Sequence, residues 1–470
     1  MVRVYDTLQR QVVQLDTRTP GVVSMYVCGP TVYDAPHVGH ARTALTYDVI
    51  RRYLTWRGYR VDIVSNVTDI DDKIIVRAAE QGRTEPELAE ENTKVYVHEM
   101  DRLGILPPSD RPHATEFIDE MVELIGELIA EGAAYVVEGK GVYFDAGSRP
   151  GYGRLSGRDR RQLIDDAGAR VDVDEDKRSP IDFALWKAAK AGEPTWDTPW
   201  GPGRPGWHTE CVAMSLDILG DGFDVHGGGD DLVFPHHENE MAQAEATGHA
   251  FARYWVHSAM VNVGGEKMSK SLGNFTTLGD VLDRFDPRAL RLLALQSHYR
   301  SEMEIHAGAL GAAAEALRRL DAFVRRVTSA GGSGDGVDVD GGTYDGVDLD
   351  ADAVGRFKAA MDDDFGTPAA MEVVFGLVRA GNTALDAGDL AAAEATAATV
   401  VELAGALGLV IGGNDQLDVE DSARVDALVA ERDRARADRD FATADRIRDE
   451  LAADGIVVED SPSGTTWHRA

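Results

Sequence analysis

Residues 36–42, Pro36-His37-Val38-Gly39-His40-Ala41-Arg42, decide the fold class of this 470-residue chain. They follow an apolar run, Val22 to Val27, which has the composition of a buried strand, and they are expected to open a helix. The free N–H groups and the dipole at a helix start favour a bound phosphate. Gly39 lets a nucleotide approach closely, while the imidazoles of His37 and His40 can donate to phosphate oxygens. Strand, turn and helix in this order predict the first half of a parallel α/β sheet that binds a nucleotide at the turn.

A second signal is the loop Lys267-Met268-Ser269-Lys270-Ser271, because the whole chain contains only nine lysines. Two ammonium groups on a short loop, here Lys267 and Lys270, suit the binding of a polyphosphate while negative charge moves during phosphoryl or nucleotidyl transfer. A solvated charged turn is the alternative interpretation of this loop taken alone. Together with His37-Val38-Gly39-His40, the loop resembles the paired HIGH and KMSKS motifs of class I aminoacyl-tRNA synthetases.

The two cysteines, Cys28 and Cys211, are expected to be reduced. No apolar N-terminal segment resembles a signal peptide, and no apolar run of ~18 residues could span a membrane. These features predict a cytoplasmic protein, in which a structural disulfide is not expected. Two free, buried cysteines are the ordinary interpretation of such a pair.

A metal site is the other interpretation of these cysteines. Pro235 to Glu240 is expected to open a helix in which His236 and Glu240, four residues apart, share one face. Two thiolates, an imidazole and a carboxylate form a borderline-soft ligand set that suits Zn²⁺. His237 and Glu238 are expected to face elsewhere.

Four longer motifs resemble the cysteinyl-tRNA synthetase family and occur in the family's order. They are Tyr26 to Asp34, Asn66 to Ile74, Gly206 to Cys211 and His226 to Leu232. In that family zinc lies in the amino-acid pocket, so the resemblance implies one zinc ion per chain. The implied zinc ligands are Cys28, Cys211, His236 and Glu240. The implied pocket-lining residues are Thr68 and Trp207, and the implied adenosine-binding residues are Gly227, Gly228, Gly229 and Asp231.

The resemblance implies a reaction in two steps. The carboxylate of L-cysteine attacks the α-phosphorus of ATP, which Mg²⁺ accompanies, and cysteine then passes to the 2′-hydroxyl of the terminal adenosine of tRNA(Cys). The enzyme's share is alignment and charge stabilisation by His37, His40, Lys267 and Lys270. An apolar pocket rejects a near-isostere such as serine by only ~1–3 kcal/mol, whereas zinc binds a thiolate directly. Zinc would therefore select the substrate without an editing site.

The predicted fold class is α/β. We expect a Rossmann-like parallel-sheet catalytic domain with an insertion, then an α-helical bundle, then a small C-terminal anticodon-binding domain. The expected ranges are 1–110 and 206–255 for the catalytic halves, 111–205 for the insertion, 256–306 for the stem-contact region with the lysine loop, 307–410 for the bundle with a flexible acidic loop at 329–352, and 421–470 for the anticodon-binding domain.

The last 50 residues are expected to form two helices followed by two short paired strands, Ile456 to Val458 and Thr465 to Trp467. Exposed arginines on the helices could contact RNA phosphates, and the Trp467 ring could stack on an unpaired base. A solvated helix pair laced with Arg and Asp is the alternative by composition. The predicted buried stripe of these helices consists of Phe441, Ala444, Ile447 and Leu451.

The charge balance argues against long-range attraction to RNA, because the chain has 81 acidic and 48 basic residues and a net charge of −33. A halophilic source is the simplest account, since molar salt shortens the Debye length to about 3 Å. The excess of Arg over Lys fits this hypothesis.

Two other functions stay open at the level of sequence. A cysteine ligase of thiol-cofactor biosynthesis has a similar adenylating core, but such ligases lack the tail that begins near Asp421. A non-catalytic RNA-binding relative would keep the fold without turnover, although the intact His37, His40, Lys267 and Lys270 disfavour it. We expect a monomer, with tRNA(Cys), L-cysteine and ATP as partners and no membrane association.

Overall fold

The computed structural model describes residues 1–159, 161–164, 177–263, 277–331, 347–412, 419–453, 456–461 and 464–469. The chain divides into two compact units. The first comprises Met1–Ala316, Asp352–Val373 and Ala406–Leu409, and the second comprises Leu317–Ala351, Val374–Gly405 and Val410–Ala470. In the described parts of the chain, no helix is both long enough and apolar enough to cross a membrane.

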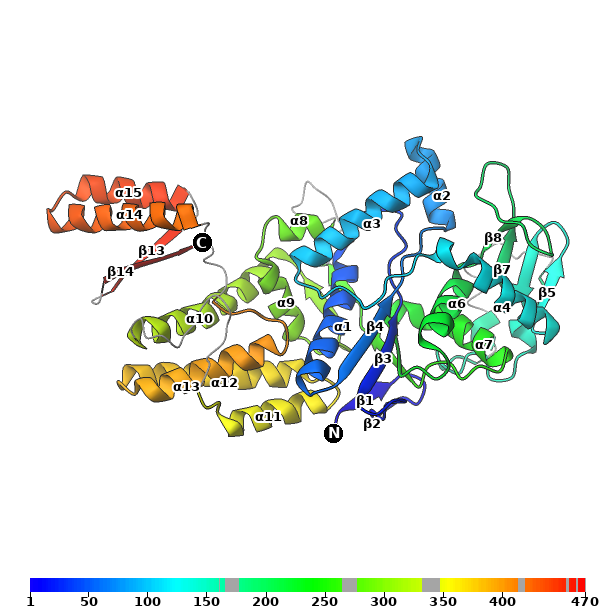
Figure 1. Cartoon of the computed structure of the whole chain (residues 1–470), viewed down its shortest axis with the longest axis horizontal. Helices are drawn as coiled ribbons and strands as arrows, with labels where there is room; N and C mark the ends of the chain where they lie inside the picture. Colours follow the sequence, from blue (N-terminus) through cyan, green and yellow to red (C-terminus); the bar gives the residue numbers. More distant parts are fainter. Residues whose placement is uncertain are drawn as a thin grey trace. The chain divides into compact units, whose positions relative to one another are not determined.

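A parallel four-stranded sheet forms the centre of the first unit (Figure 1). Its strands lie in the order β10-β9-β3-β4, and the predicted strand at Val22 to Val27 is confirmed as β3. The register places Tyr26 of β3 level with His226 of β9. Because all four strands are parallel, their carboxyl ends meet at one edge, which is where open α/β sheets bind ligands. The strands are β3 (Val22–Val27), β4 (Arg60–Ser65), β9 (Val225–Gly229) and β10 (Tyr254–Ser258).

Helix α1 (Val38–Trp56) connects β3 to β4 and begins at the predicted place. The next helix, α2 (Asp72–Gln81), begins after Asp71, because the Asp71 carboxylate caps it by accepting from Lys73 N. It is followed by α3 (Glu85–Arg102), which begins with a capping box formed by Thr84 and Glu87.

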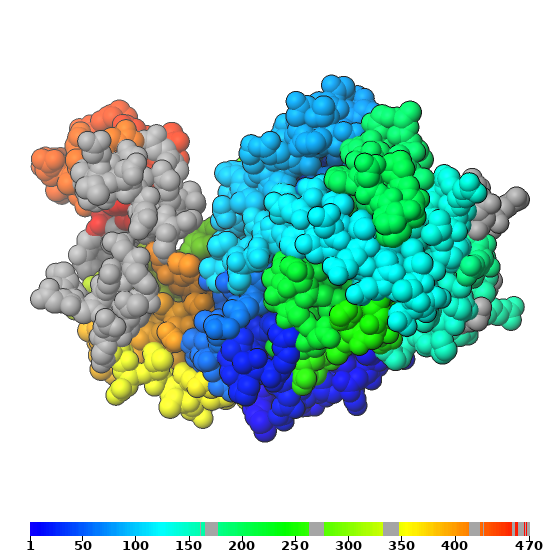
Figure 2. All heavy atoms as spheres, turned by 45° about the vertical axis from the view of Figure 1, so that its right-hand side comes forward, coloured from blue at the N-terminus to red at the C-terminus, as the bar shows by residue number. Residues whose placement is uncertain are grey.

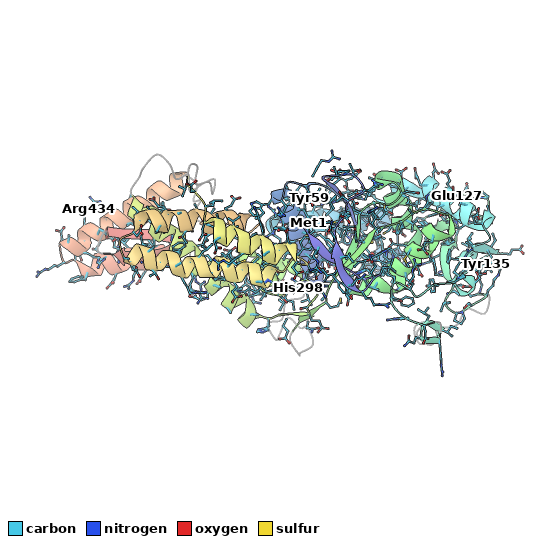
Figure 3. All side chains as sticks on the ribbon, turned by 90° about the horizontal axis from the view of Figure 1, so that it is seen from below. Met1, Tyr59, Glu127, Tyr135, His298 and Arg434 are labelled. Atoms are coloured by element: carbon cyan, nitrogen blue, oxygen red, sulfur yellow. The ribbon has the colours of Figure 1, made fainter. Side chains whose placement is uncertain are left out.

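The insertion is built on an antiparallel sheet, in the order β5-β6-β7-β8. The apolar face of α4 packs on α6 in a core that also contains Cys211. The insertion and α6 therefore share one hydrophobic core. In Figure 2 the cyan atoms of the insertion lie beside green atoms of the later half of the catalytic region. Figure 3 labels Glu127 on α4 and Tyr135 on β5, at the end of this unit away from Tyr59. These elements are η1 (Ala114–Phe117), α4 (Ile118–Ala130), β5 (Ala134–Val137), β6 (Gly141–Phe144), η2 (Ala146–Ser148), β7 (Phe183–Ala188), β8 (Gly203–Pro205) and α6 (Trp207–Leu219).

The remaining elements of the first unit surround the sheet. Strand β10 runs to Ser258, past the expected domain boundary at residue 255. A buried ion pair joins Arg291 Nη1 of α9 to Asp48 Oδ2 of α1 at 2.6 Å, and Arg291 also donates to the carbonyl oxygens of Leu103 and Gly104. This network attaches α9 to the helix that carries the nucleotide-binding turn. The elements are β1 (Arg3–Asp6), β2 (Gln11–Gln14), η3 (Asp230–Leu232), η4 (Val233–His237), α7 (Glu238–Ala246), β11 (Val261–Val263), α8 (Leu278–Leu282), α9 (Pro287–Leu295), β12 (Met303–Ile305) and α11 (Ala351–Asp362).

Helices and one small sheet make up the second unit. Helix α10 extends to Gly331, and α11 begins at Ala351, so the expected loop at 329–352 is shorter at both ends, and its residues 332–346 lie outside the described part of the chain. Helices α10 and α12 each contribute to both units, which divides the expected bundle at 307–410. The helices are α10 (Ala307–Gly331), α12 (Thr367–Asp386) and α13 (Leu390–Gly405).

The C-terminal segment contains the predicted two helices and two antiparallel strands (Figure 1). Ala444, Ile447 and Leu451 are buried as expected, but the prediction for Phe441 is wrong, because its side chain is 62% exposed. Phe441 is the first residue of its helix, beyond the face that packs against the neighbouring helix. The elements are α14 (Val419–Ala437), α15 (Phe441–Ala453), β13 (Ile456–Ser461) and β14 (Gly464–Arg469).

Candidate metal centre and active site

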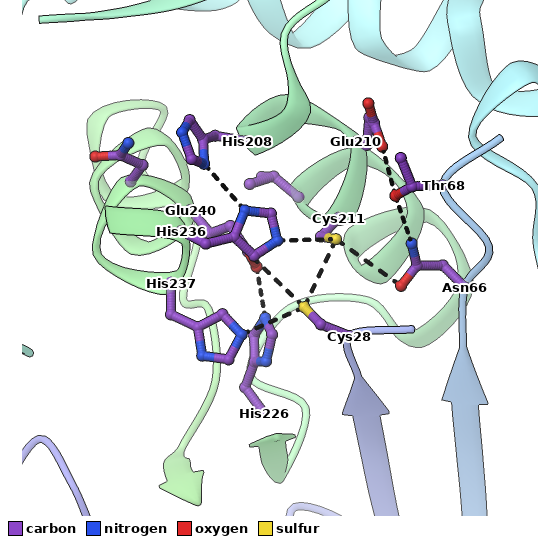
Figure 4. Close-up of polar contacts among 12 residues, drawn as sticks. Cys28, Asn66, Thr68, His208, Glu210, Cys211, His226, His236, His237 and Glu240 are labelled. Carbon is purple, nitrogen blue, oxygen red and sulfur yellow. Dashed lines mark hydrogen bonds and ion pairs between the residues drawn. The ribbon is translucent and has the colours of Figure 1, made fainter. Parts of the chain in front are cut away.

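The structure brings Cys28, Cys211, His236 and Glu240 together at the carboxyl edge of the parallel sheet (Figure 4). Cys28 directly follows β3, Cys211 lies in the first turns of α6, His236 lies in η4, and Glu240 lies in α7. One ligand atom from each residue lies within 4.8 Å of the others, and all four residues are buried. Three segments that are distant in sequence, around Cys28, Cys211 and His236 to Glu240, therefore converge on one point.

The spacing of these atoms fits a tetrahedral ion. The Sγ atoms of Cys28 and Cys211 are 3.7 Å apart, and both thiols are free. Two sulfurs that each lie 2.3 Å from a tetrahedral zinc ion are about 3.8 Å apart. Cys211 Sγ lies 3.5 Å from His236 Nε2, and Glu240 Oε1 lies 3.6 Å from Cys28 Sγ. The two sulfurs thus have the separation that a tetrahedral zinc ion requires, while His236 Nε2 and Glu240 Oε1 contact each other directly at 2.9 Å.

A second, overlapping set replaces Cys211 and His236 by His226 and His237. His237 Nε2 lies 3.3 Å from Cys28 Sγ, so the expectation that His237 faces away from the site is wrong. Residues 233–237 form an irregular turn rather than a regular α-helix, because the backbone at Phe234 is extended, with φ −142° and ψ 129°. His226 Nε2 lies 2.6 Å from Glu240 Oε2 and was not predicted as a site residue. Its place beside Tyr26 in the sheet register is the signal that could have revealed it.

Other side chains hold the cluster in position. His208 Nδ1 contacts His236 Nδ1 at 3.0 Å, which leaves His236 Nε2 facing the sulfurs. The Trp207 ring stacks on His236 with centroids 4.0 Å apart. Thr68 Oγ1 donates to Glu210 Oε2 at 2.9 Å, next to the cluster. The structure therefore places Thr68 near the candidate ligands (Figure 4) and Trp207 against one of them, His236.

Glu238 connects this site to the insertion. It is fully buried and accepts hydrogen bonds from the backbone N–H groups of Gly153 and Ser156, at 2.9 and 2.8 Å. Hydrogen bonds from backbone N–H groups satisfy a buried carboxylate that would otherwise be costly. Glu238 therefore faces away from the candidate ligands, as predicted, and holds the 153–156 loop against α7.

The electrostatics of the cluster favour a cation. A hydrogen bond from the Cys28 thiol lowers the pKa of Cys211 to about 6, while burial, together with Cys211, raises the pKa of Cys28. Burial opposes ionisation of Glu240, but His226 and His236 outweigh it and hold its pKa well below the usual range. Burial likewise opposes protonation of His236, but Glu240 and Cys211 outweigh it and raise its pKa to about 10. A thiolate and a carboxylate in this buried space thus stabilise a positive charge, which the protonated His236 ring supplies at neutral pH.

The turn that is predicted to bind the nucleotide, residues 36–42, lies at the start of α1. His37 Nδ1 accepts from Gly39 N at 3.1 Å, and His40 Nδ1 accepts from His37 N at 3.1 Å. The two rings stack with centroids 3.9 Å apart. Because each Nδ1 is an acceptor, a neutral ring carries its proton on Nε2 and can donate from there. Burial lowers the pKa of His37, and burial together with His37 lowers the pKa of His40 to about 3.

The glycine-rich end of β9 lies next to α1. Gly228 N donates to Tyr47 Oη at 2.6 Å, and this hydroxyl donates to Val256 O at 2.6 Å, so Tyr47 joins α1, β9 and β10. A Cβ atom on Gly227 would lie 2.4 Å from the buried Tyr47 ring, which explains the need for glycine there. The structure therefore places Gly228, Gly229 and Asp231 beside the turn that carries His37.

One cavity of about 450 Å³ connects the two sites. Its lining includes Cys28 and Trp207 from the metal centre, His37 and His40 from the nucleotide-binding turn, and Asp231 between them. A small amino acid at the cluster and a nucleotide at α1 would therefore share a single chamber. The predicted residues Lys267 and Lys270 lie outside the described part of the chain.

Comparison with known proteins agrees with this geometry. The family model described as tRNA synthetases class I (C) catalytic domain matches residues 14–315, the DALR domain model matches residues 356–411, and the model of the cysteinyl-tRNA ligase anticodon binding domain matches residues 419–467. The cysteine–tRNA ligase of Alkalilimnicola ehrlichii is 48% identical over 479 residues, covering 100% of both chains. The cysteine–tRNA ligase of Symbiobacterium thermophilum is 46% identical over 471 residues, again covering 100% of both.

A solved structure supports the fold independently. The Mycobacterium tuberculosis methionyl-tRNA synthetase in complex with methionyl-adenylate superposes with a TM-score of 0.61 at 17% identity, covering 83% of this chain and 91% of that chain. At this identity the likeness concerns the fold alone, and it confirms the predicted Rossmann-like α/β class. The full-length relatives and the matched models together show that the chain belongs to the cysteine–tRNA ligase family of class I tRNA synthetases.

Proposed function

We propose that the chain is a zinc-dependent cysteine–tRNA ligase that uses one cavity to activate L-cysteine with ATP and to transfer it to tRNA(Cys). The ATP-dependent ligase activity follows from family membership. The observation that carries the zinc proposal is the convergence of Cys28, Cys211, His236 and Glu240 in the cavity that also contains His37 and His40. We assign the first four residues as ligands of one zinc ion.

The metal centre supports selection of cysteine over serine. A bound zinc ion would supply a direct bond to the substrate thiolate, which a hydroxyl cannot replace at neutral pH. His208 and Trp207 hold the His236 ring in place, and His226 holds Glu240. Such outer contacts fix the orientation of ligands. The chain's own residues therefore position the amino acid with its carboxylate free to react.

The nucleotide end would hold ATP for in-line attack by that carboxylate. A carboxylate is already nucleophilic at neutral pH, so the reaction needs alignment and charge stabilisation rather than a general base. His37 and His40 would donate from Nε2 to phosphate oxygens, and Gly39 leaves room for their approach. We assign Lys267 and Lys270 to the migrating charge on the phosphates, and Mg²⁺ to the nucleotide. Gly228, Gly229 and Asp231 would contact the adenosine.

A second candidate function is a cysteine ligase of thiol-cofactor biosynthesis. The C-terminal segment disfavours it, because residues 419–467 match an anticodon binding domain model. We propose that this segment reads the tRNA anticodon and that the helices of 307–410 connect it to the catalytic domain, with 111–205 as the insertion and 256–306 as the stem-contact region. A non-catalytic relative would lack exchange between ATP and pyrophosphate.

Three further proposals concern the conditions in which the protein works. We propose a cytoplasmic monomer from a halophilic source, and the net charge of −33 supports adaptation to high salt. The test is dialysis from molar salt into low-salt buffer, with circular dichroism and aminoacylation as measurements. A protein that keeps its fold and activity in low salt would contradict the halophile proposal.

The decisive experiment is aminoacylation of tRNA(Cys) with cysteine and with serine, using metal-replete and chelated enzyme. We expect charging with cysteine only in the metal-replete enzyme and no comparable charging with serine. Elemental analysis should find one zinc ion per chain. Comparable charging with serine, or full activity without metal, would contradict the zinc proposal while leaving the ligase activity in place.

A further inference from the structure

Within the described part of the chain, three cations line the cavity without an ion pair to a carboxylate: Lys73, Arg111 and Arg51, and Arg51 donates to the carbonyl oxygen of Pro107. Lys73 and Arg111 belong to the cavity lining, together with His37 and His40. Neither side chain forms an ion pair or a hydrogen bond to another residue in the ranges that the structure describes. The chain has 81 acidic residues against 48 basic ones, so a cation without a carboxylate partner is unexpected. This arrangement indicates that an external anion completes the site.

The carboxylates near Lys73 are occupied by other cations. Asp34 Oδ2 pairs with Arg77 Nη2 at 2.6 Å, and Asp72 pairs with both Lys187 and Arg204. The Lys73 ammonium instead lies 5.3 Å from the centroid of the Tyr33 ring. An exposed cation–π contact of this kind contributes only about 0.5–1 kcal/mol, so it leaves the ammonium available.

Arg111, which also lines the cavity, likewise has no ion pair with a carboxylate among the described residues. Asp69, near this segment, accepts from Thr115 N and Oγ1 at 3.0 and 2.6 Å and also contacts His113. Arg111 lies close enough to Tyr96 to oppose the burial that raises the pKa of this phenol. The Tyr96 ring in turn meets the His40 ring edge-on, with centroids 6.5 Å apart. Arg111 therefore lies near the nucleotide-binding turn but not within it.

We infer that Lys73 and Arg111 bind phosphate groups of the RNA 3′ strand as it enters the cavity. The inference rests on the proposed function. Lys73 is exposed and also lines an adjoining open groove, together with Tyr33, Asp34, Asp72, Val76, Arg77 and Glu80. The carboxylates of this groove are already paired with Arg77, Lys187 and Arg204. The phosphates of ATP already have the start of α1 as a binding site. Cations at the outer rim suit a polyanion that extends from the cavity to the surface.

The test compares two measurements on the full-length enzyme. Exchange between ATP and pyrophosphate with cysteine requires no RNA, whereas aminoacylation requires tRNA(Cys). We expect Lys73→Gln and Arg111→Gln each to lower kcat/KM for tRNA about tenfold more than they lower kcat/KM for ATP in exchange. Lys73→Arg and Arg111→Lys should restore most of the activity towards tRNA, because they keep the charge.

Arg83→Gln is the matched control, since Arg83 follows α2, lines neither the cavity nor the adjoining groove, and is paired with Glu91. It should leave kcat/KM for tRNA within about twofold of the wild type. In the test variants, the dependence of log KM on log salt should become shallower by about 0.7 for each phosphate of the single strand that the enzyme no longer neutralises.

Two outcomes would overturn the inference. An equal decrease in exchange and in aminoacylation would assign these cations to ATP, and unchanged values in both measurements would show that they bind no substrate phosphate. Failure of the proposed function gives a different result, because the wild-type enzyme itself would then show no cysteine-dependent exchange. Near-normal circular dichroism of each variant is required for either conclusion.

Discussion

The metal centre and the nucleotide-binding turn share one cavity but are built in opposite ways. In the candidate metal centre, the four candidate ligands are buried and come from three distant segments, and burial together with neighbours in the cluster shifts their pKa values. At the turn, His37 and His40 belong to one short segment, and backbone N–H groups next to them set their orientation. Selection of an amino acid requires a rigid, desolvated site, whereas nucleotide binding uses groups that any helix start provides.

Replacement of a candidate metal ligand should have the largest effect on zinc content and on activity with cysteine. Cys211→Ser removes a thiolate from the set of four, so we expect loss of zinc and a fall of more than about 1,000-fold in kcat/KM for cysteine in exchange. The KM for ATP should change little, because the turn is locally built. Elemental analysis and pyrophosphate exchange provide the measurements. An equal loss of affinity for cysteine and ATP would instead indicate a structural metal whose removal disturbs the whole cavity.

Removal of a hydrogen-bond donor at the nucleotide-binding turn should have the next largest effect on activity. It should lower kcat without loss of zinc. His40→Ala removes an Nε2–H donor from the developing charge, for which about 10²–10³-fold in kcat is expected. The zinc content should stay at that of the wild type. The measurements are single-turnover formation of the adenylate and elemental analysis of the same sample. Loss of zinc in this variant would contradict the independence of the two sites.

A change outside the ligand set should have an intermediate effect. His208→Leu removes the side chain that orients His236, and outer contacts of this kind are worth about 10–100-fold in metal affinity. Competition with a chelator measures the affinity, and His249→Leu is a suitable control because His249 pairs with Asp221 away from the cluster. Unchanged zinc affinity in His208→Leu would show that Trp207 alone is sufficient to orient the ligand.

The smallest effect concerns pH and the His40 ring. Its pKa of about 3 in the folded protein is below the ~6.5 of an unfolded chain, so the unfolded state binds more protons between these values. The stability that the neutral ring contributes is complete above pH ~6.5 and decreases as the pH falls towards 3. Thermal unfolding at pH 7 and pH 5 should show a smaller decrease of Tm in His40→Gln than in the wild type. An equal decrease would contradict a neutral, buried His40.

Much of the fold could be predicted because its signals are local. The apolar run that became β3, the start of α1 and the antiparallel strands of the tail all follow from the composition of short segments. Predictions failed where a helix end or an irregular turn decided the outcome. Phe441, which was expected in a buried stripe, is the exposed first residue of α15.

The metal centre shows what sequence alone could not provide. Motif order allowed the four scattered candidate ligands to be named through a family resemblance, but spacing could not show that they meet. His237 was expected to face away, but after the irregular turn at 233–237 its Nε2 atom lies 3.3 Å from Cys28 Sγ. Only the packing of α6 and α7 against the sheet determines such contacts.

The sequence by itself determined the parallel α/β class, the nucleotide-binding turn and the family, because each depends on residues that are neighbours along the chain. The tertiary structure decided which histidines surround the cysteines and that His226 holds Glu240. It also decided that Lys73 and Arg111 face a common cavity. The physical reason is that strand register and helix packing bring distant segments within a few ångströms, and the pKa of each buried group then depends on those neighbours.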